Sequence, residues 1–340
     1  MATSRLSLTT GKRWIKTALV GSGALRLVSK VTGQGIAILM YHSVLDEPEH
    51  QANTVDMGHQ TETFRRQMEI IAHEYDPVSM DEVPSFVTGE RPMPRRAVVI
   101  TFDDGYADNL EVAAPILSHF GICATFYVSV RCVDEAQPPW VARVRYAFRR
   151  SKKQLWQSPN GTIWPLADYE GRETAFIAAC ALCARLTGEA QERMVEAMER
   201  ELDAGPIPPE ACRMLTWDQV RALTRGGHIV GSHTLSHPNL AHVGDDELNT
   251  EITKSRRRIQ DEVGGPILHF AYPNPVLSPH WTMRTVAASR QAGYQTAVIA
   301  TPGLVRQRDD LHSLHRLPAS RNLEAFRWNL ACLFLGRRSM

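Results

Sequence analysis

The chain has 340 residues, of which 43% are hydrophobic and 22% charged, which is enough for one large α/β domain or two small ones. The formal net charge is +1, so no overall electrostatic field favours nucleic acid as a partner. Six cysteines in a chain of this length do not form a disulfide framework, and their number is typical of a reducing compartment.

Residues 1–35 are predicted to be a basic amphipathic segment, because the first 33 residues contain six Lys or Arg and no acidic residue. No apolar run reaches the roughly 18 residues of a membrane span. Glycines interrupt "TALVGSGAL", which makes it a poor signal-peptide core. Two interpretations stay open: a helix lying on a membrane surface, or an amphipathic helix packed on the rest of the protein.

Short β-type runs alternate with helical patterns from residue 36 to about residue 320. Such alternation is typical of a parallel sheet, either a barrel or a doubly wound sheet. Several of the helical patterns end in glycine, a residue that commonly ends a helix. Seven strands are predicted, at residues 36–44, 76–80, 97–102, 123–130, 227–234, 267–273 and 294–300.

Residues 140 to about 212 interrupt this alternation, with two or three helical patterns and no convincing strand. The segment is too long for an ordinary crossover. We therefore predict a helical insertion beside the mouth of a barrel, from which "GPIPPEAC" leads the chain back. Cys180 and Cys183 lie in one of its helical patterns and are interpreted as core residues, since no second ligand pair is nearby.

Residues 321–340 are predicted to form a C-terminal helix in which apolar and basic side chains are mixed. This helix and the N-terminal segment could both contact an anionic membrane, or they could cover the bottom of the barrel. The predicted localisation is cytoplasmic, and under the membrane alternative the protein is peripheral on the inner face of the membrane. The apolar residues concerned are Phe326, Leu330, Leu333 and Phe334.

Two adjacent carboxylates, Asp103 and Asp104, follow the predicted strand 97–102 in "VVITFDDGY". Their repulsion at the end of a buried strand costs free energy unless a metal or a shared proton makes use of them. A second cluster, His233 and His237 in "GSHTLSHPNL", follows the predicted strand 227–234. Two histidines four residues apart on a turn or a first helical turn face the same way and can share one metal.

Both clusters lie at the carboxyl ends of predicted strands, where parallel α/β folds gather their catalytic groups. Two histidines and one carboxylate, with open positions, are what a catalytic divalent metal needs. One aspartate can then bind the metal while its neighbour stays free as a base, and the cation offsets their repulsion. The residues predicted to line the substrate site beside them are His42, Tyr106, Tyr272, Pro273 and Asn274. Two alternatives stay open: a structural hydrogen-bonding role for His42, and a rim or core aromatic for Tyr106.

At these motifs the sequence resembles the polysaccharide deacetylase (NodB-homology) family of carbohydrate esterases. The matching stretches are "TFDDGY" (101–106), "SHTLSH" (232–237) and "FAYPN" (270–274), in the family's order, and the Tyr-Pro pair of the third indicates one subgroup. The resemblance covers about residues 36–320 and implies a deformed (β/α) barrel. The predicted fold class is therefore α/β, a deformed barrel of about seven strands with a helical insertion.

By position, the resemblance implies Asp104, His233 and His237 as metal ligands and Asp103 as the catalytic base. The base takes a proton from the water that attacks an N-acetyl carbonyl, and an acid then protonates the departing sugar amine. The implied cofactor is a divalent metal ion. Zinc suits two histidines and an aspartate, and cobalt, iron or nickel would suit them too.

The chain departs from the family in two places. The best-known members carry an arginine in the third motif that pairs with the base, but "HFAYPNP" has none, so the group that orients Asp103 is open. The family's general acid comes from a late Leu-x-His motif. Here "DDLHSLHRLP" offers His315, which is predicted as the acid, and His312; an ordinary surface-loop histidine is the alternative for either.

The predicted function is hydrolytic removal of an N-acetyl group from an amino sugar in a polysaccharide, an oligosaccharide or a lipid-linked glycan precursor. Two alternatives stay open: a deformylase or deacylase of another amide-bearing sugar lipid, and a catalytically silent glycan-binding relative. The expected partner is an N-acetylated glycan, and the sequence does not specify an oligomeric state.

Overall fold

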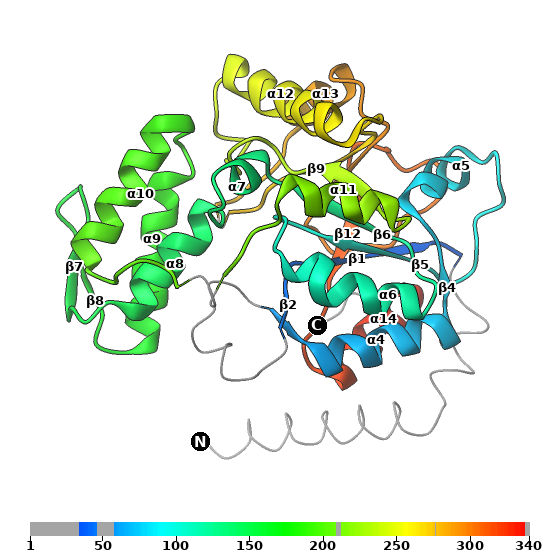
Figure 1. Ribbon diagram of the computed structural model, residues 1–340, viewed down its shortest axis with the longest axis horizontal. Helices are drawn as coiled ribbons and strands as arrows, with labels where there is room; N and C mark the ends of the chain where they lie inside the picture. The colour runs from blue at the N-terminus through cyan, green and yellow to red at the C-terminus, as the bar shows by residue number, and fades with distance from the viewer. Residues whose placement is uncertain (1–33, 46–57, 209–211, 276, 337–340) are drawn as a thin grey trace.

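The computed structural model describes residues 34–45, 58–208, 212–275 and 277–336 (Figure 1). Seven parallel strands close into a barrel, since β1 pairs with β12 on one side and with β5 on the other. The fold class predicted from the sequence is thereby confirmed. In barrel order the strands are β1 (Ile36–Tyr41), β12 (Leu314–Pro318), β11 (Thr296–Ile299), β10 (His269–Ala271), β9 (Ile229–Ser232), β6 (Ala124–Val128) and β5 (Ala97–Phe102).

Six of the seven predicted strands lie in this barrel, and one does not. The predicted strand 76–80 is reduced to β4 (Asp76–Pro77), which pairs only with the first residues of β5. Its place is taken by β12, whose sequence "LHRLP" contains no apolar run. Pairing with β1 and β11, rather than the propensity of its own residues, makes this segment a strand.

Alternate side chains of a barrel strand face opposite directions. In β1, Ile36 and Ile38 pack inside the barrel together with Val99 and Val298, whereas Leu39 packs between the strands and the outer helices. Both faces of the strands are covered, so all six residues of β5 are buried. Continuous apolar strands are expected where helices cover a parallel sheet.

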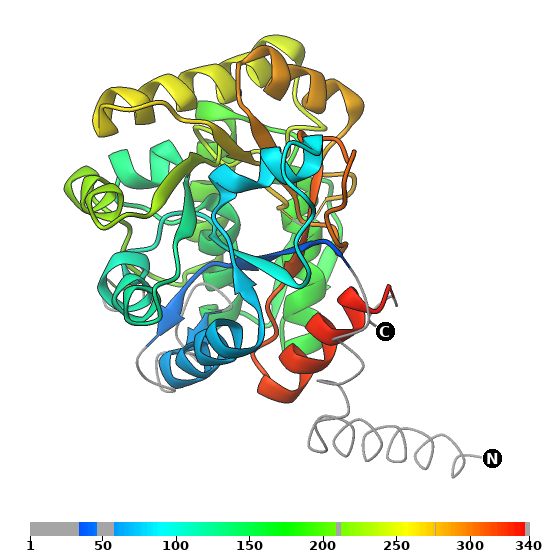
Figure 2. The ribbon, with the colours of Figure 1, turned by 90° about the vertical axis from the view of Figure 1, so that its right-hand side faces the viewer.

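Helices enclose the strands, and Figure 2 shows them around the barrel. Outside the insertion they are α4 (Thr61–Glu74), α5 (Val83–Thr88), α6 (Ala114–His119), α7 (Val130–Asp134), α11 (Trp217–Arg225), α12 (Asp245–Val263), α13 (Met283–Gln291) and α14 (Leu323–Phe334). Two short strands, β2 (Val44–Leu45) and β3 (His59–Gln60), pair with each other. Within the described ranges, no helix is both long enough and apolar enough to cross a membrane.

Helix α14 lies where a C-terminal helix was predicted, and its apolar side chains pack on the protein. Phe326, Leu330 and Phe334 are buried, and the centroid of the Phe334 ring lies 5.7 Å from that of Tyr75. These three side chains are therefore covered by protein and do not face a membrane. Membrane contact stays a prediction for residues 1–33, which lie outside the described residues.

The insertion (residues 140–202) stands beside the barrel, in green in Figure 1. It consists of α8 (Trp140–Arg150), α9 (Tyr169–Cys183), α10 (Gly188–Leu202) and the antiparallel strands β7 (Leu155–Gln157) and β8 (Ile163–Pro165). Its separate hydrophobic core includes Phe148, Phe176, Cys180 and Cys183, so the two cysteines are core residues. The strand pair was not predicted, because three-residue strands carry too little periodicity to recognise.

Candidate active site

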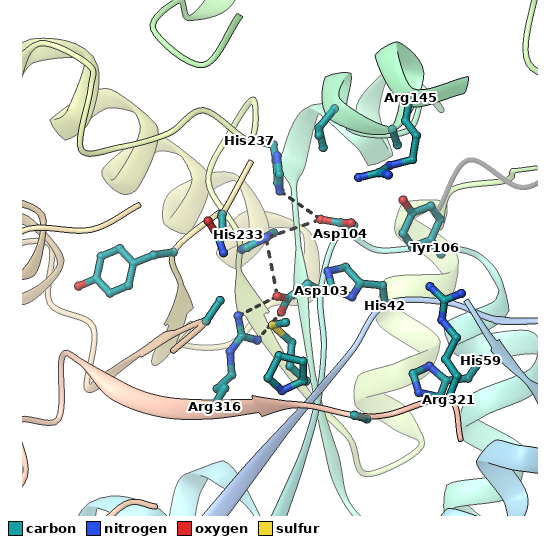
Figure 3. A pocket seen from close by; sticks show the side chains of 18 residues that line it. His42, His59, Asp103, Asp104, Tyr106, Arg145, His233, His237, Arg316 and Arg321 are labelled. Carbon is teal, nitrogen blue, oxygen red and sulfur yellow. Dashed lines mark hydrogen bonds and ion pairs between the residues drawn. The ribbon is translucent and has the colours of Figure 1, made fainter. Parts of the chain in front are cut away.

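A cavity of about 290 Å³ opens at the carboxyl ends of the barrel strands (Figure 3). Asp103 and Asp104 follow β5, His233 and His237 follow β9, and Asn274 follows β10. Because all strands of the barrel are parallel, the loops after them meet at one end. The fold thus brings the polar motifs of the sequence to one place.

Asp104, His233 and His237 form a buried group, which we call the ligand group. Asp104 Oδ1 lies 3.6 Å from His233 Nε2 and 3.4 Å from His237 Nε2. Two ligand atoms that bind a tetrahedral zinc at about 2.1 Å are separated by roughly 3.4 Å. The ligand group therefore fits a divalent metal, and among the residues that the structure describes no other such group of three converges.

His233 is held in the tautomer that a metal ligand requires. A carbonyl oxygen can only accept, so Nδ1 donates to the Ala271 oxygen at 2.8 Å, and Nε2 presents its lone pair to Asp104. Burial lowers the pKa of His233 to about 4 and lowers the pKa of His237 well below its ordinary value. Both rings are therefore neutral at pH 7, which is the metal-binding form of imidazole.

Three residues of the site have left-handed backbone conformations: Asp104 (φ 77°), Thr234 (φ 70°) and His237 (φ 58°). Such conformations cost of order 1–3 kcal/mol each in non-glycine residues and cluster at functional sites. Thr234 helps to hold the loop, because its hydroxyl accepts from the amide of His237 at 3.0 Å and donates to the carbonyl of His233 at 2.5 Å. These contacts fix the direction in which the two imidazoles point.

The buried carboxylate of Glu251 on α12 fixes the loop between His233 and His237. It accepts hydrogen bonds from the backbone amides of Leu235 and Ser236 at 2.9 and 3.0 Å, and from the Ser236 hydroxyl at 2.5 Å. Burial raises the pKa of Glu251, although these donors oppose the shift. The carboxylate therefore positions the two histidines without touching them.

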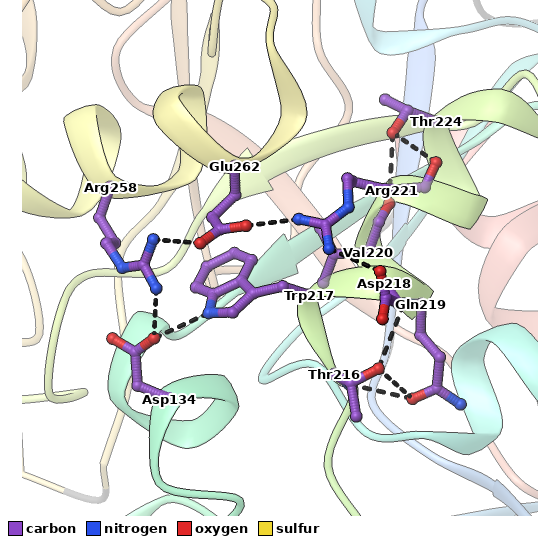
Figure 4. Close-up of polar contacts among 10 residues, drawn as sticks. All are labelled: Asp134, Thr216, Trp217, Asp218, Gln219, Val220, Arg221, Thr224, Arg258 and Glu262. Atoms are coloured by element: carbon purple, nitrogen blue, oxygen red, sulfur yellow. Dashed lines mark hydrogen bonds and ion pairs between the residues drawn. The ribbon is translucent and has the colours of Figure 1, made fainter.

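Helix α12 is itself tied to α7 and α11 by polar contacts around Trp217 (Figure 4). The indole Nε1 and Arg258 Nη2 both donate to Asp134 Oδ1, at 2.7 and 2.9 Å. Arg258 lies over the Trp217 ring, 4.8 Å from its centroid, and Glu262 accepts from both Arg258 and Arg221. The helix that carries Glu251 thus has a fixed position relative to the barrel.

Replacing Glu251 with glutamine is expected to weaken metal binding about 10-fold, the lower end of the range for residues that support metal ligands. The amide has one acceptor oxygen where the carboxylate has two, so one donor of the loop loses its partner. Metal affinity is measured by competition with a chelator. The control is Asp261→Asn, on the exposed side of α12; equal affinities in the two variants would contradict the positioning role.

Arg316 of β12 supplies the partner of Asp103 that the third motif lacks. Its Nη1 and Nη2 donate to Asp103 Oδ1 and Oδ2 at 2.6 and 2.8 Å, and the two side chains are 0% and 3% exposed. Burial acts to raise the pKa of Asp103, but the charge and hydrogen bonds of Arg316, together with the charges of His233 and His42, outweigh it, and the pKa is lowered to about 2. Asp103 is therefore ionised and fixed, with Oδ2 4.0 Å from His233 Nε2.

Neither histidine predicted as the general acid lines the cavity. His315 precedes Arg316 in β12, so its side chain faces the opposite way, and Nδ1 lies 3.1 Å from the carbonyl oxygen of Thr301. His312 is buried, with Nδ1 3.3 Å from Ser289 Oγ on α13. The prediction that His315 is the acid is thus corrected, because strand alternation turns it away from the cavity.

Most of the residues predicted to line the substrate site do line the cavity. Tyr272 forms part of its wall, but its hydroxyl donates to the carbonyl oxygen of His312 at 3.0 Å and lies 2.8 Å from Ser289 Oγ. This hydroxyl is engaged in the core and does not point to a substrate. Pro273 is not among the described lining residues. The other predicted residues that line the cavity are His42, Tyr106 and Asn274.

The cavity also has walls that no sequence pattern identified. Val141, Ala142 and Arg145 of α8 line it, so the insertion forms part of the site. Trp140 joins the insertion to the loop of the ligand group, because its Nε1 donates to the carbonyl oxygen of His237 at 2.8 Å. On the barrel side, the further polar lining residues are His59, Arg316 and Arg321.

The chain is similar to several known proteins. The sequence profile of the family described as Polysaccharide deacetylase matches residues 90–297. YxkH of Bacillus subtilis, itself assigned only provisionally as a polysaccharide deacetylase, is 18% identical over 286 residues, which cover 84% of this chain and 71% of YxkH. The poly-beta-1,6-N-acetyl-D-glucosamine N-deacetylase of Escherichia coli K12 is 34% identical over 87 residues, which cover 25% of this chain but only 12% of that enzyme.

Among solved structures, the Streptococcus pyogenes deacetylase PplD in complex with acetate has a TM-score of 0.59 at 20% identity, covering 89% of this chain and 99% of that chain. At this identity the likeness shows a shared fold. The family profile spans more than half of the chain and includes both aspartates and both histidines of the site. The Tyr-Pro subgroup stays a prediction. The protein therefore belongs to the polysaccharide deacetylase family, and it is a hydrolase of that family, as its motifs predict.

Proposed function

We propose that the protein is a metal-dependent N-deacetylase that acts on an amino sugar in a polysaccharide, an oligosaccharide or a lipid-linked glycan. The observation that carries this proposal is the buried ligand group beside Asp103, which Arg316 keeps ionised. A protein that only binds glycans has no need of a fixed, ionised carboxylate beside metal ligands. The related E. coli enzyme is an N-deacetylase of an N-acetylated glycan, which supports this substrate class.

A divalent cation held by Asp104, His233 and His237 would supply Lewis acidity and lower the pKa of a nearby water. Asp103 is the base that takes the proton of the attacking water, because it is ionised and lies next to the ligand group without belonging to it. Arg316 binds both carboxylate oxygens of Asp103, so the base keeps one orientation. Zinc suits the ligands, as do cobalt, iron and nickel.

Asp103→Asn is expected to keep the bound metal and to lower the rate of deacetylation about 10²–10⁴-fold, the usual scale for a general base. An amide cannot take a proton from water at neutral pH, but it preserves the size of the side chain. The rate is measured as acetate release, together with metal content. Loss of metal from Asp103→Asn, with retention in Asp104→Asn, would show that the two aspartates have the opposite roles.

With His312 and His315 turned away, His42 is the histidine placed to protonate the departing amine. It lines the cavity at the end of β1 (Figure 3), and its charge acts on the pKa of Asp103. His59 also lines the cavity, but burial lowers its pKa to about 4, so at neutral pH it has no proton to donate.

His42→Ala is therefore expected to lower kcat about 10²–10⁴-fold while the protein keeps its metal. The loss arises because the amine must leave without a proton donor. Steady-state acetate release measures kcat, and His59→Ala is the matched control from the same cavity. A large loss in His59→Ala with a normal rate in His42→Ala would assign the acid to His59.

The proposed reaction is tested by adding N-acetylglucosamine oligomers to the metal-loaded protein and measuring acetate. Acetate release that stops on chelation and returns with metal supports the proposal. Formate from a formamido sugar lipid, without acetate from the oligomers, would identify a deformylase. Binding of the oligomers without release of either acid would identify a silent glycan-binding relative.

A further inference from the structure

His42 lies on the turn between β1 and β2, and its position affects the whole site. It lines the cavity, and its charge acts on the pKa of Asp103, His233 and His237. Figure 3 shows its ring beside Asp103. Strand β1 ends at Tyr41, so pairing within the barrel does not extend to His42. Other contacts must therefore hold the turn that carries the imidazole.

The side chain of Asn109, the first residue of the π-helix η2 (Asn109–Ala113), supplies one of these contacts. Its Nδ2 donates to the carbonyl oxygen of His42 at 2.7 Å and to Asp108 Oδ1 at 2.9 Å. Both partners are acceptors, which fixes the orientation of the amide. Asn109 is 0% exposed, and within the described ranges its own Oδ1 has no partner. Such an oxygen costs about 1–3 kcal/mol, so the value of this amide lies in its two donors.

Asp108 holds the next two residues of the same turn. Its Oδ1 accepts from the backbone amide of Val44 at 3.1 Å, and its Oδ2 accepts from the hydroxyl of Ser43. Burial raises the pKa of Asp108 to about 7, although its hydrogen bonds act to lower it. A carboxyl group kept where ionisation is unfavourable is more typical of functional sites than of ordinary turns. Three consecutive residues of the turn are thus held by two adjacent side chains.

The segment that carries these two side chains is a continuation of the turn that carries Asp103. Backbone hydrogen bonds of 2.8 Å join residues 105–107 to residues 213–215, which lead into α11. The short stretch from Asp103 to Asp108 is therefore held from outside the barrel as well as by β5. Because it also holds the turn after β1, the positions of Asp103 and His42 are fixed relative to each other.

We propose that Asp108 and Asn109 are positioning residues for His42, which hold the turn after β1 so that the imidazole faces the departing amine. This inference rests on the proposed function, in which His42 protonates that amine. A general acid must lie within hydrogen-bond reach of the group it protonates. A displacement of about 1 Å can lower a rate about 10²-fold. Neither side chain is among the described residues that line the cavity, so both act through the turn.

Asp108→Leu and Asn109→Leu are each expected to lower kcat for acetate release about 10²-fold, with KM and metal content close to wild type. Leucine has a similar size but neither donates nor accepts a hydrogen bond. Asp108→Asn should recover most of the rate, because the amide oxygen still accepts from Val44 and the hydroxyl of Ser43 can rotate to accept. The matched control is Glu111→Gln in the same π-helix, an exposed residue that pairs with an arginine outside the turn.

The double variant His42→Ala/Asn109→Leu tests whether Asn109 acts through His42. If it does, the second substitution costs little once the imidazole is gone, and the two losses do not add. Additive losses, or a normal kcat in folded Asp108→Leu and Asn109→Leu, would overturn the inference. Unfolding curves identify a leucine variant that has lost its structure. Ser43→Ala removes only one donor to Asp108, and in that case a smaller loss of kcat in this variant is the result that supports positioning.

The imidazole is also observed without turnover, by NMR of the His42 ring protons, which are assigned with His42→Ala. These resonances should move in Asp108→Leu and Asn109→Leu and stay in place in Glu111→Gln. Unmoved resonances in both leucine variants would overturn the positioning role even if the protein deacetylates glycans. Moved resonances in a protein that releases no acetate would keep that role and refute the proposed reaction. A normal kcat in His42→Ala would refute the acid, and with it this inference, but not the deacetylase activity.

Discussion

The variants Asp104→Ala, His233→Ala and His237→Ala are each expected to lose bound metal and to release acetate only at the background rate. Catalytic metal sites commonly have three protein ligands. Removing one leaves two, and in the described part of the chain no fourth side chain belongs to the ligand group. Metal content after dialysis and acetate release, measured on the same samples, check this expectation.

The ligand residues are buried, so the same variants must be compared for folding. Unfolding curves of the metal-free proteins show whether a variant has lost its structure rather than its metal. His73→Ala, on the exposed surface of α4, is the control and should keep both metal and activity. Full metal content in all three ligand variants would refute the ligand set. Full activity without bound metal would show that the reaction does not depend on the metal.

The ligand group could be predicted from the sequence because each of its parts is local. Asp103 and Asp104 directly follow an apolar run, and His233 and His237 follow another. Once both runs are taken as parallel strands, their carboxyl ends must lie at the same end of the barrel. The sequence could not show how the loops are held, because Glu251 reaches them from a separate helix.

The partner of Asp103 could not be predicted in this way. Arg316 is 213 residues away in the chain, and it lies in a strand whose sequence, LHRLP, contains no apolar run that would predict a strand. Only closure of the barrel between β1 and β11 brings it to the base. The same strand explains the wrong general acid: Leu314 and Arg316 face the interior, so His315 between them faces outward.

The wall that the insertion contributes depends on long-range packing. Arg145 reaches the cavity because the insertion has its own core, which includes Phe148 and Phe176, and because Trp140 bonds to the carbonyl oxygen of His237. No regular spacing of residues in the sequence predicts any of these contacts. Residues outside the family motifs therefore shape the cavity, and they are where substrate preference is expected to be set.

Arg316→Met is expected to destabilise the protein by about 3–5 kcal/mol, the cost of leaving one member of a buried ion pair without its partner. Methionine keeps the length of the side chain but has no charge, so the carboxylate of Asp103 stays buried beside His233 with no cation. The free energy of unfolding is measured in urea at neutral pH on metal-free protein. The free energy of unfolding of Arg316→Lys should fall between that of Arg316→Met and that of the wild-type protein, since lysine keeps the charge but not the paired hydrogen bonds.

A double-mutant cycle with Asp103→Asn separates the buried charge from lost packing. Replacing both partners removes the unpaired charge, so Arg316→Met/Asp103→Asn should recover part of the stability that Arg316→Met loses. Both variants should release acetate slowly, because Arg316→Met removes the two hydrogen bonds that orient the base and the double variant has no base at position 103. If the double variant is less stable than Arg316→Met, or if Arg316→Met unfolds like the wild-type protein, then the pair does not stabilise the site. Asp103 would in that case need another group to keep it ionised.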